Sequence, residues 1–481
     1  MTNLASPPRV DAGTRRTGLL ERVTPVSVLA AMCMLLFVFP SDSVILAIGA
    51  SGFVGGLFAL LIFGGWLASM LFGLHSPWNH RSPTRTAVLL VWIVSLVSYA
   101  LRPWDSLSVA QASSADRWLI LLAGMTGVAL VANDCLTTIH DVIRTTRALV
   151  TGANVCAAIA AAQFWFGFDV VPYIRSAMPG FTAKGTAVSG QARGTLVRVS
   201  GTAANPLELG VIAGALLPAA IYLAMYDTDR RLMRRLIPVA LLLSGVAATV
   251  SRSGVLAVII SSTIWVCLLP ATQRVVAFAI APLGLVAIFM TAPGFVTIIA
   301  QLATAGNSDP SIAHRTQTYK LVGNLVGQHP WLGSGGGTYL PVDAFHIFDN
   351  EYLMAVVQLG VAGLIATLVL LFVPAVSTLL MSRRLSDPRD RALGSVLGGS
   401  GVAIGVCAAT FDIFSFAMIT FVAAIVSGLS GAYVQLARQY DPDATGSDAR
   451  NSRELDARGL RGFPGRRDGS GPNCLSTTGT Q

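Results

Sequence analysis

Three arginines lie at positions of this largely apolar chain where a charged side chain needs a compensating partner. Arg198 lies eight residues before Pro206, Arg252 stands between two apolar tracts in the string SRSG, and Arg315 belongs to HRTQTYK. An arginine at the membrane is costly unless it faces water or an anion. Guanidinium groups carry a fixed charge and bind phosphate oxygens in a bidentate manner. The three arginines therefore predict one shared phosphate or diphosphate site, and the alternative for each is a side chain that reaches toward lipid head groups.

Acid–base candidates precede a long apolar tract that starts at residue 353. His346 and Asp349 are three residues apart and would share a face if the following helix extended back by one turn. Either group can accept a proton from a hydroxyl nucleophile. Asp349 could instead cap the helix, and His346 could be an exposed loop histidine. His314, His329 and Glu351 complete the group of candidates.

A glycine run, GSGGG at residues 333–337, follows His329 and Pro330. It resembles a phosphate-binding loop only in composition, because no Lys-Ser or Lys-Thr pair follows it. The run therefore predicts a structural turn, and His329 is expected to belong to that turn.

Composition places these residues in a membrane protein. Of 481 residues, 53% are hydrophobic and 12% charged, and the mean hydropathy is +0.65. Several continuous apolar tracts of about 17 to 25 residues match the length of a helix that crosses a bilayer. The net charge of +9 comes mostly from arginines between the tracts. They indicate orientation in a membrane rather than a nucleic-acid partner. The six cysteines show neither a disulfide framework nor a zinc-site spacing.

The tracts predict an all-α polytopic membrane protein with about twelve transmembrane helices within residues 24–436. The distribution of Lys and Arg places both termini in the cytoplasm, including the segment 1–23. It also places two long loops, 168–205 and 292–352, outside, the second with a short amphipathic helix at 311–328. The tail at 437–481 lacks apolar periodicity and is expected to be disordered. The twelve predicted helices are 24–40, 53–74, 86–101, 118–134, 148–167, 206–226, 236–250, 254–270, 274–291, 353–381, 392–411 and 414–436.

The order of four strings resembles the O-antigen ligase and Wzy-type O-antigen polymerase superfamily. They are RVSGTAANPLELG, SRSG, HRTQTYKLVGNLVGQHPWLGSGGGTY and DNEYLMAVVQLGVAGL, and they span roughly Phe181 to Leu364. The resemblance implies a membrane glycosyltransferase of the GT-C type that needs no metal or other cofactor. Its donor would be a glycan linked to polyprenyl (undecaprenyl) diphosphate, and its acceptor a glycan or a lipid. It would act at the external face of the bacterial inner membrane, in cell-envelope polysaccharide biosynthesis, with a chain-length regulator or a flippase as a possible partner.

The resemblance also gives roles to particular residues. It implies that Arg198, Arg252 and Arg315 face the donor diphosphate. The family's external loop commonly ends in a His-Asn pair, whereas this chain has Asp349 before Asn350. The base is therefore either Asp349 or His346.

Two other classes of protein compete with the enzyme. A secondary transporter or lipid-linked glycan flippase also suits twelve helices, but the two halves of the sequence show no repeat, and the charges gather at the external face. A catalytically inactive scaffold that keeps the fold is the third alternative, because Asp349 replaces the histidine that the family commonly has.

Overall fold

A computed structural model describes most of the helical part of the chain. It covers residues 24–73, 82–101, 107–183, 190–193, 196–227, 231–275, 319, 321–341 and 347–439. The chain divides into two units, Met1–Ala437 and Arg438–Gln481, and the fold and site below belong to the first. The predicted segment 1–23 lies outside the described residues, as do most of the predicted helix 274–291 and the first part of the amphipathic helix 311–328. The predicted disordered tail 437–481 starts too early, because a helix continues to Gln439, and the rest of the tail lies outside the described residues.

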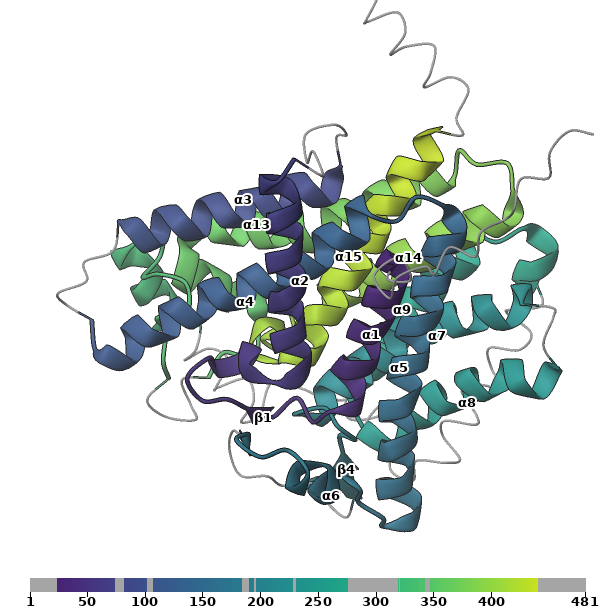
Figure 1. Ribbon diagram of the computed structural model, residues 1–481, viewed down its shortest axis with the longest axis horizontal. Helices are drawn as coiled ribbons and strands as arrows, with labels where there is room; N and C mark the ends of the chain where they lie inside the picture. Colours follow the sequence, from purple (N-terminus) through teal and green to yellow (C-terminus); the bar gives the residue numbers. More distant parts are fainter. Residues whose placement is uncertain are drawn as a thin grey trace, which may run out of the picture. The chain divides into compact units, whose positions relative to one another are not determined.

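Long α-helices dominate the described residues (Figure 1). Eight of them are long and apolar enough to cross a membrane, and two shorter apolar helices, α1 and α9, accompany them. The prediction of a helical polytopic membrane protein is confirmed. The helices are α1 (Pro25–Val38), α2 (Val54–Leu71), α3 (Pro83–Ala100), α4 (Val109–Asp134), α5 (Ile139–Phe166), α6 (Val171–Ser176), α7 (Pro206–Tyr226), α8 (Leu232–Thr249), α9 (Arg252–Leu268), α13 (Glu351–Ser382), α14 (Pro388–Cys407) and α15 (Ala417–Gln439), with 3-10 turns η2 (Gly49–Gly52) and η5 (Ile413–Ser415).

Two helices, α4 and α5, begin nine residues, about two and a half turns, before the predicted start. α4 begins at Val109 rather than at residue 118, and α5 begins at Ile139 rather than at 148. Both have a capping box, Ser108 with Gln111 and Thr138 with Asp141, in which side chain and backbone exchange hydrogen bonds. The polar first turns have low hydropathy, so the apolar tract alone places the start too late.

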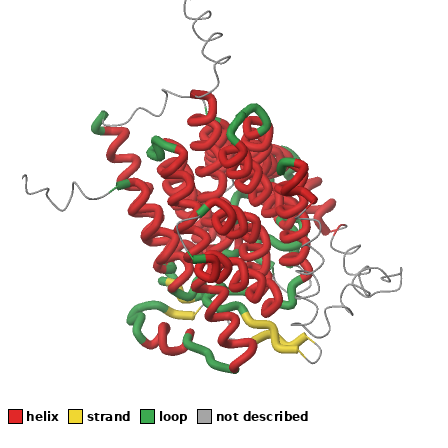
Figure 2. The backbone as a smooth tube through the Cα atoms, turned by 90° about the vertical axis from the view of Figure 1, so that its right-hand side faces the viewer, coloured by secondary structure: helices red, strands yellow, loops and turns green. Residues whose placement is uncertain are grey.

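Short strands add to the predicted all-α fold at one end of the helices, as Figure 2 shows. β1 (Ser43–Val44) pairs with β2 (Thr182–Ala183), and β3 (Gly190–Arg193) pairs with β4 (Leu196–Val199), both antiparallel. Arg175 of α6 forms an ion pair with Asp42 beside β1. These contacts tie the predicted loop 168–205 to the connection between α1 and α2.

Helices α7 and α9 approach each other closely through glycines. A Cβ atom added to Gly254 would lie 2.9 Å from the carbonyl carbon of Gly210, and one on Gly214 would lie 2.5 Å from the Gly254 oxygen. Small residues allow such backbone contact between membrane helices, where dispersion and hydrogen bonds drive association. Farther along the pair, Ser261 Oγ donates a hydrogen bond of 3.0 Å to the carbonyl oxygen of Gly214. This packing fixes the position of the first turn of α9, which begins at Arg252.

Helix α13 is broken at Gly360, whose φ of 68° and ψ of −166° are not helical. The segment 330–335 binds the backbone groups that the break releases. Val361 N–H donates to Pro330 O at 2.9 Å and Ala362 N–H to Trp331 O at 3.2 Å, while Gly335 N–H donates to Gln358 O at 2.8 Å. Gly360 is needed there, because an added Cβ would lie 2.2 Å from the Trp331 carbonyl carbon. The glycine run is therefore a structural turn, as predicted.

Candidate functional site

Arg198 lies on β4 and reaches the C-terminal end of α8. Its Nε donates a hydrogen bond of 3.0 Å to the carbonyl oxygen of Thr249, the last residue of α8. The residue is 9% exposed. Basic side chains commonly bind the last carbonyls of a helix, where the helix dipole is negative. This hydrogen bond fixes the plane of the guanidinium group beside the turn that leads to Arg252.

That turn connects α8 to α9 through only Val250 and Ser251. Val250 has a φ of 47°, the one positive φ of a non-glycine residue in the described part of the chain. A β-branched residue in this region is strained, and such strain persists only where the surroundings impose it. Ser251 then caps α9 by accepting a hydrogen bond of 3.3 Å from Gly254 N–H. The result is an exposed Arg252 at the first position of α9, three residues after the carbonyl that Arg198 binds.

Asp349 lies just before α13 and is exposed. The neighbouring Asn350 is the N-cap, and its Oδ1 accepts hydrogen bonds of 2.9 Å from Tyr352 N–H and 3.4 Å from Leu353 N–H. The alternative in which Asp349 caps the helix is therefore wrong. The helix also does not extend back to place His346 and Asp349 on one helical face, because α13 begins at Glu351.

Tyr339 and Phe348 stack beside Asp349. Their ring centroids are 4.7 Å apart with an interplanar angle of 14°, and Phe348 is fully buried against Val322 and Val357. Burial raises the pKa of the Tyr339 phenol above its ordinary value. The phenol therefore stays protonated near neutral pH and can donate a hydrogen bond, but it is not a base.

One connection, residues 408–416 between α14 and α15, joins the arginine turn to the start of α13. On one side, Ser253 Oγ and Thr410 Oγ1 are 2.8 Å apart, and Cys407 Sγ donates to Ser253 O at 3.4 Å. On the other side, Glu351 N–H donates to Ala408 O at 2.8 Å, and Glu351 Oε2 accepts from Phe414 N–H at 3.0 Å. Arg252 therefore adjoins a residue that contacts this connection, Ser253, and Asp349 lies two residues before another, Glu351.

A second buried carboxylate, Glu208, holds the end of that connection. Its Oε1 accepts a hydrogen bond of 3.0 Å from Ile419 N–H in the first turn of α15. Its Oε2 accepts one of 2.9 Å from Ala204 N–H and one of 3.5 Å from Ser41 Oγ.

We call the end at which α7, α9, α13 and α15 begin the site end, and the other end of the same helices the opposite end.

Sequence reasoning identified part of this arrangement. It singled out Arg198, Arg252, Asp349 and the general position of Glu351, and it missed Glu208 and Thr410. No local pattern distinguishes Glu208 in PLELG or Thr410 in AATFD, because each acts through contact with a distant segment. The predicted residues Arg315, His346 and His314 lie outside the described residues, so their proximity to Arg252 stays a prediction. His329 is exposed, and its carbonyl accepts from Gly333 N–H at 3.0 Å within the predicted turn.

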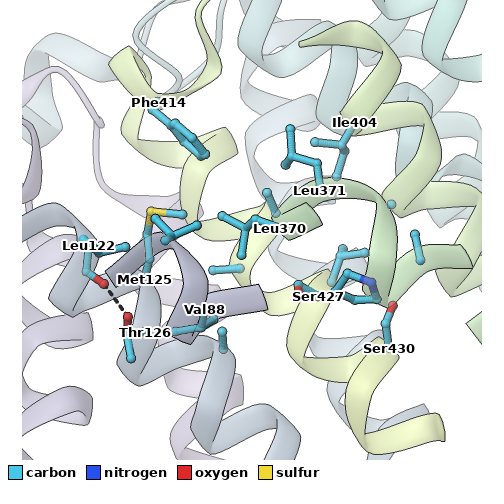
Figure 3. A pocket seen from close by; sticks show the side chains of 18 residues that line it. Val88, Leu122, Met125, Thr126, Leu370, Leu371, Ile404, Phe414, Ser427 and Ser430 are labelled. Atoms are coloured by element: carbon cyan, nitrogen blue, oxygen red, sulfur yellow. Dashed lines mark hydrogen bonds between the residues drawn. The ribbon is translucent and has the colours of Figure 1, made fainter. Parts of the chain in front are cut away.

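Two hollows lie among the described elements. One of about 370 Å³ lies at the site end between α3 and the segment 328–334, with Ser98, Gln328, His329 and Trp331 in its wall. The other, of about 30 Å³, is enclosed mainly by apolar side chains such as Met125, Leu370 and Phe414 of α4, α13 and the connection before α15 (Figure 3). The second has room for about one or two water molecules, so it is a packing gap rather than a substrate site.

Metal ligands do not gather in the part of the chain that the structure describes. No group of three His, Cys, Asp or Glu residues there is placed to hold a metal ion. The groups that the site end offers for chemistry are guanidinium donors, carboxylates and hydroxyls.

Comparison with known families gives this arrangement a context. Residues 237–368 match the O-antigen ligase family (Wzy_C). The match supports the resemblance that the sequence motifs indicated, and that prediction is confirmed. The matched region includes α8 from residue 237 onward, the arginine turn, Arg252, Asp349 and α13 past its break. Arg198 and Glu208 precede it, so contacts from outside the matched region complete the site. A search of curated proteins found no match.

Proposed function

We propose that this protein is a membrane glycosyltransferase that polymerises or ligates a polyprenyl-diphosphate-linked glycan at the external face of the bacterial inner membrane. The O-antigen ligase match and the membrane-length helices support a membrane glycan ligase or polymerase. The observation that carries the finer proposal is the α8–α9 turn. It holds Arg198 by its Nε and presents Arg252, with the α14–α15 connection between this turn and Asp349.

The proposed site residues serve two parts of the reaction, the leaving group and the nucleophile. An acceptor hydroxyl oxygen forms a bond to the anomeric carbon of the donor sugar, and the bond from that carbon to the diphosphate oxygen breaks. The diphosphate leaves with the electron pair, and its developing charge is stabilised by Arg198, Arg252 and Arg315. The hydroxyl proton passes to Asp349 or His346. Oriented guanidinium groups stabilise the departing charge without a metal ion, which agrees with the predicted metal-independent reaction.

The orientation in the membrane follows from the distribution of arginines. Four arginines lie near the starts of helices. Arg85, Arg231 and Arg389 lie in or next to the first turns of α3, α8 and α14, and Arg147 lies in the third turn of α5. All four helices begin at the opposite end. Basic residues favour the cytoplasmic side of short loops, so the site end is proposed to face outward, where lipid-linked glycans are joined.

A transporter or flippase is the second candidate, and the break in α13 is the feature that raises it, because broken helices are common at transporter sites. In such sites the released backbone groups face a cavity. Here Pro330, Trp331 and Gly335 bind backbone groups on both sides of Gly360. The break is therefore already filled by the chain itself, which favours the enzyme.

A deletion strain tests the proposal and separates its two forms. An accumulated lipid-linked single repeat would indicate lost polymerisation, and an accumulated full-length lipid-linked chain would indicate lost ligation. Complementation with R198A, R252A, R315A, H346A and D349A should fail for the arginines and for whichever of the last two is the base. Normal glycan length and amount with all five variants would refute the enzymatic assignment and would fit a scaffold.

A further inference from the structure

Two buried glutamates hold the α14–α15 connection and the first turn of α15 that follows it. Glu351, 4% exposed, accepts from Phe414 N–H, and Glu208, fully buried, accepts from Ile419 N–H. Between them Thr420 Oγ1 donates to Ile413 O at 2.9 Å, which ties the first turn of α15 to η5. The connection is thus held at two points only five residues apart.

The connection in turn holds the catalytic candidates. Thr410 contacts Ser253, the neighbour of Arg252, and Ala408 accepts from the backbone of Glu351, two residues after Asp349. We infer that Glu208 and Glu351 are positioning residues that act as hydrogen-bond acceptors for the connection and so set the separation of Arg252 from Asp349. The inference rests on the proposed function only in naming Arg252 and Asp349 as substrate-facing.

The two carboxylates differ in how many backbone N–H groups they accept hydrogen bonds from. In the described contacts Glu351 uses one oxygen, Oε2, for one backbone N–H. Glu208 uses both oxygens for two different backbone N–H groups, those of Ile419 and Ala204. A glutamine has one acceptor oxygen and one NH₂ donor. Glutamine can therefore accept the single hydrogen bond that Glu351 accepts. At position 208 its one oxygen can accept only one of the two hydrogen bonds, and its NH₂ group faces the other N–H donor. Ser41 Oγ also accepts from Ala204 N–H at 2.9 Å, so the loss in E208Q is partial.

Cross-linking measures the position of the connection without enzymatic activity. Because Ser253 Oγ and Thr410 Oγ1 are 2.8 Å apart, cysteines at these positions lie within reach of a disulfide. The pair S253C/T410C is made in a C407A background, because Cys407 also contacts Ser253. Disulfide formation in isolated membranes under a mild oxidant is followed by mass spectrometry of the linked peptides. Asp227→Asn, at the other end of α7 from Glu208, is the matched control.

The control and E351Q should cross-link at the parental rate. E208Q should cross-link more slowly, and E208A and E351A should be the slowest. We expect a loss of about tenfold for the alanine variants, since a buried N–H group is left without its acceptor. E351Q should also support normal glycan transfer, because positioning needs an acceptor oxygen rather than a charge.

Three results would overturn the inference. They are a parental cross-linking rate in E351A, equal rates in E208Q and E351Q, or an E351Q protein that cross-links normally but loses glycan transfer. The last result would make Glu351 a chemical participant. If the rates follow the expected order while no variant of any kind alters the glycan, the positioning role stands and the proposed function fails.

Discussion

The two ends of the helices satisfy their ionisable side chains in different ways. At the opposite end, carboxylates pair with arginines: Asp134 with Arg85 at 2.5 Å, and Asp227 with Arg147 at 3.1 Å. At the site end, Glu208 and Glu351 accept from backbone N–H groups, Arg198 donates to a backbone carbonyl, and Arg252 has no ion pair within the described residues. Among the described residues, Arg175 and Asp42 also form an ion pair at the site end.

This difference separates a structural end from a chemical one. Paired charges neutralise each other and leave little potential for a ligand. Because the carboxylates at the site end accept from backbone amides, the exposed Arg252 guanidinium group is not neutralised by an ion pair within the described residues and can bind the proposed diphosphate. A structural variant at the opposite end should therefore affect stability, and a variant at the arginine turn should affect transfer.

Breaking the buried pair at the opposite end should give the largest loss of stability. Asp134 has a fully buried side chain that also accepts from Trp66 Nε1 at 3.4 Å and Asn133 Nδ2 at 2.5 Å. D134A leaves Arg85 partly buried without its carboxylate, a change that costs about 3–5 kcal/mol. Thermal unfolding of the purified protein in detergent should show a lower apparent Tm, while transfer per folded molecule stays unchanged. Lost transfer at normal stability would contradict the division between the ends.

A substitution of Gly360, at the break in α13, should give the next largest loss of stability. G360A must adopt a φ of 68° and place a methyl group 2.2 Å from the Trp331 carbonyl carbon. The strain alone costs about 1–3 kcal/mol, and the backbone contact adds to it. The same thermal unfolding experiment applies, with Gly64→Ala as the control, since a Cβ at that position of α2 meets no atom within 4 Å. Equal stability of the two variants would mean that the break is not needed.

Removing the cap of α13 should have the smallest effect. N350A loses the two hydrogen bonds from Tyr352 and Leu353 N–H, a loss of about 1 kcal/mol. N350D keeps the acceptor oxygen and should retain parental stability in the same unfolding assay. If N350D were as unstable as N350A, the amide group itself would be required, and the capping role would be wrong.

Sequence reasoning works where the physical signal is local. Continuous apolar tracts identified the described helices other than the short α6, and an arginine isolated between such tracts indicated the α8–α9 turn. The polar first turns of α4 and α5 escaped because their capping boxes lower the local hydropathy. The break at Gly360 escaped because QLGVAGL reads as an uninterrupted helix, and only the insertion of residues 330–335 reveals it. Glu208 is satisfied by Ile419, 211 residues away, so no window of sequence could show its role.

The most direct test of the central claim is glycan transfer by the reconstituted protein with the lipid-linked intermediate from the deletion strain. R252A should lower the transfer rate by about 100-fold, as loss of one preorganised charge-stabilising donor does, and R252K should recover part of it. R147A, which removes an arginine paired at the opposite end, is the control and should transfer at the parental rate once folded. An R252A protein that is folded and transfers within about twofold of the parent would contradict the account, since Arg252 would then not serve the leaving group.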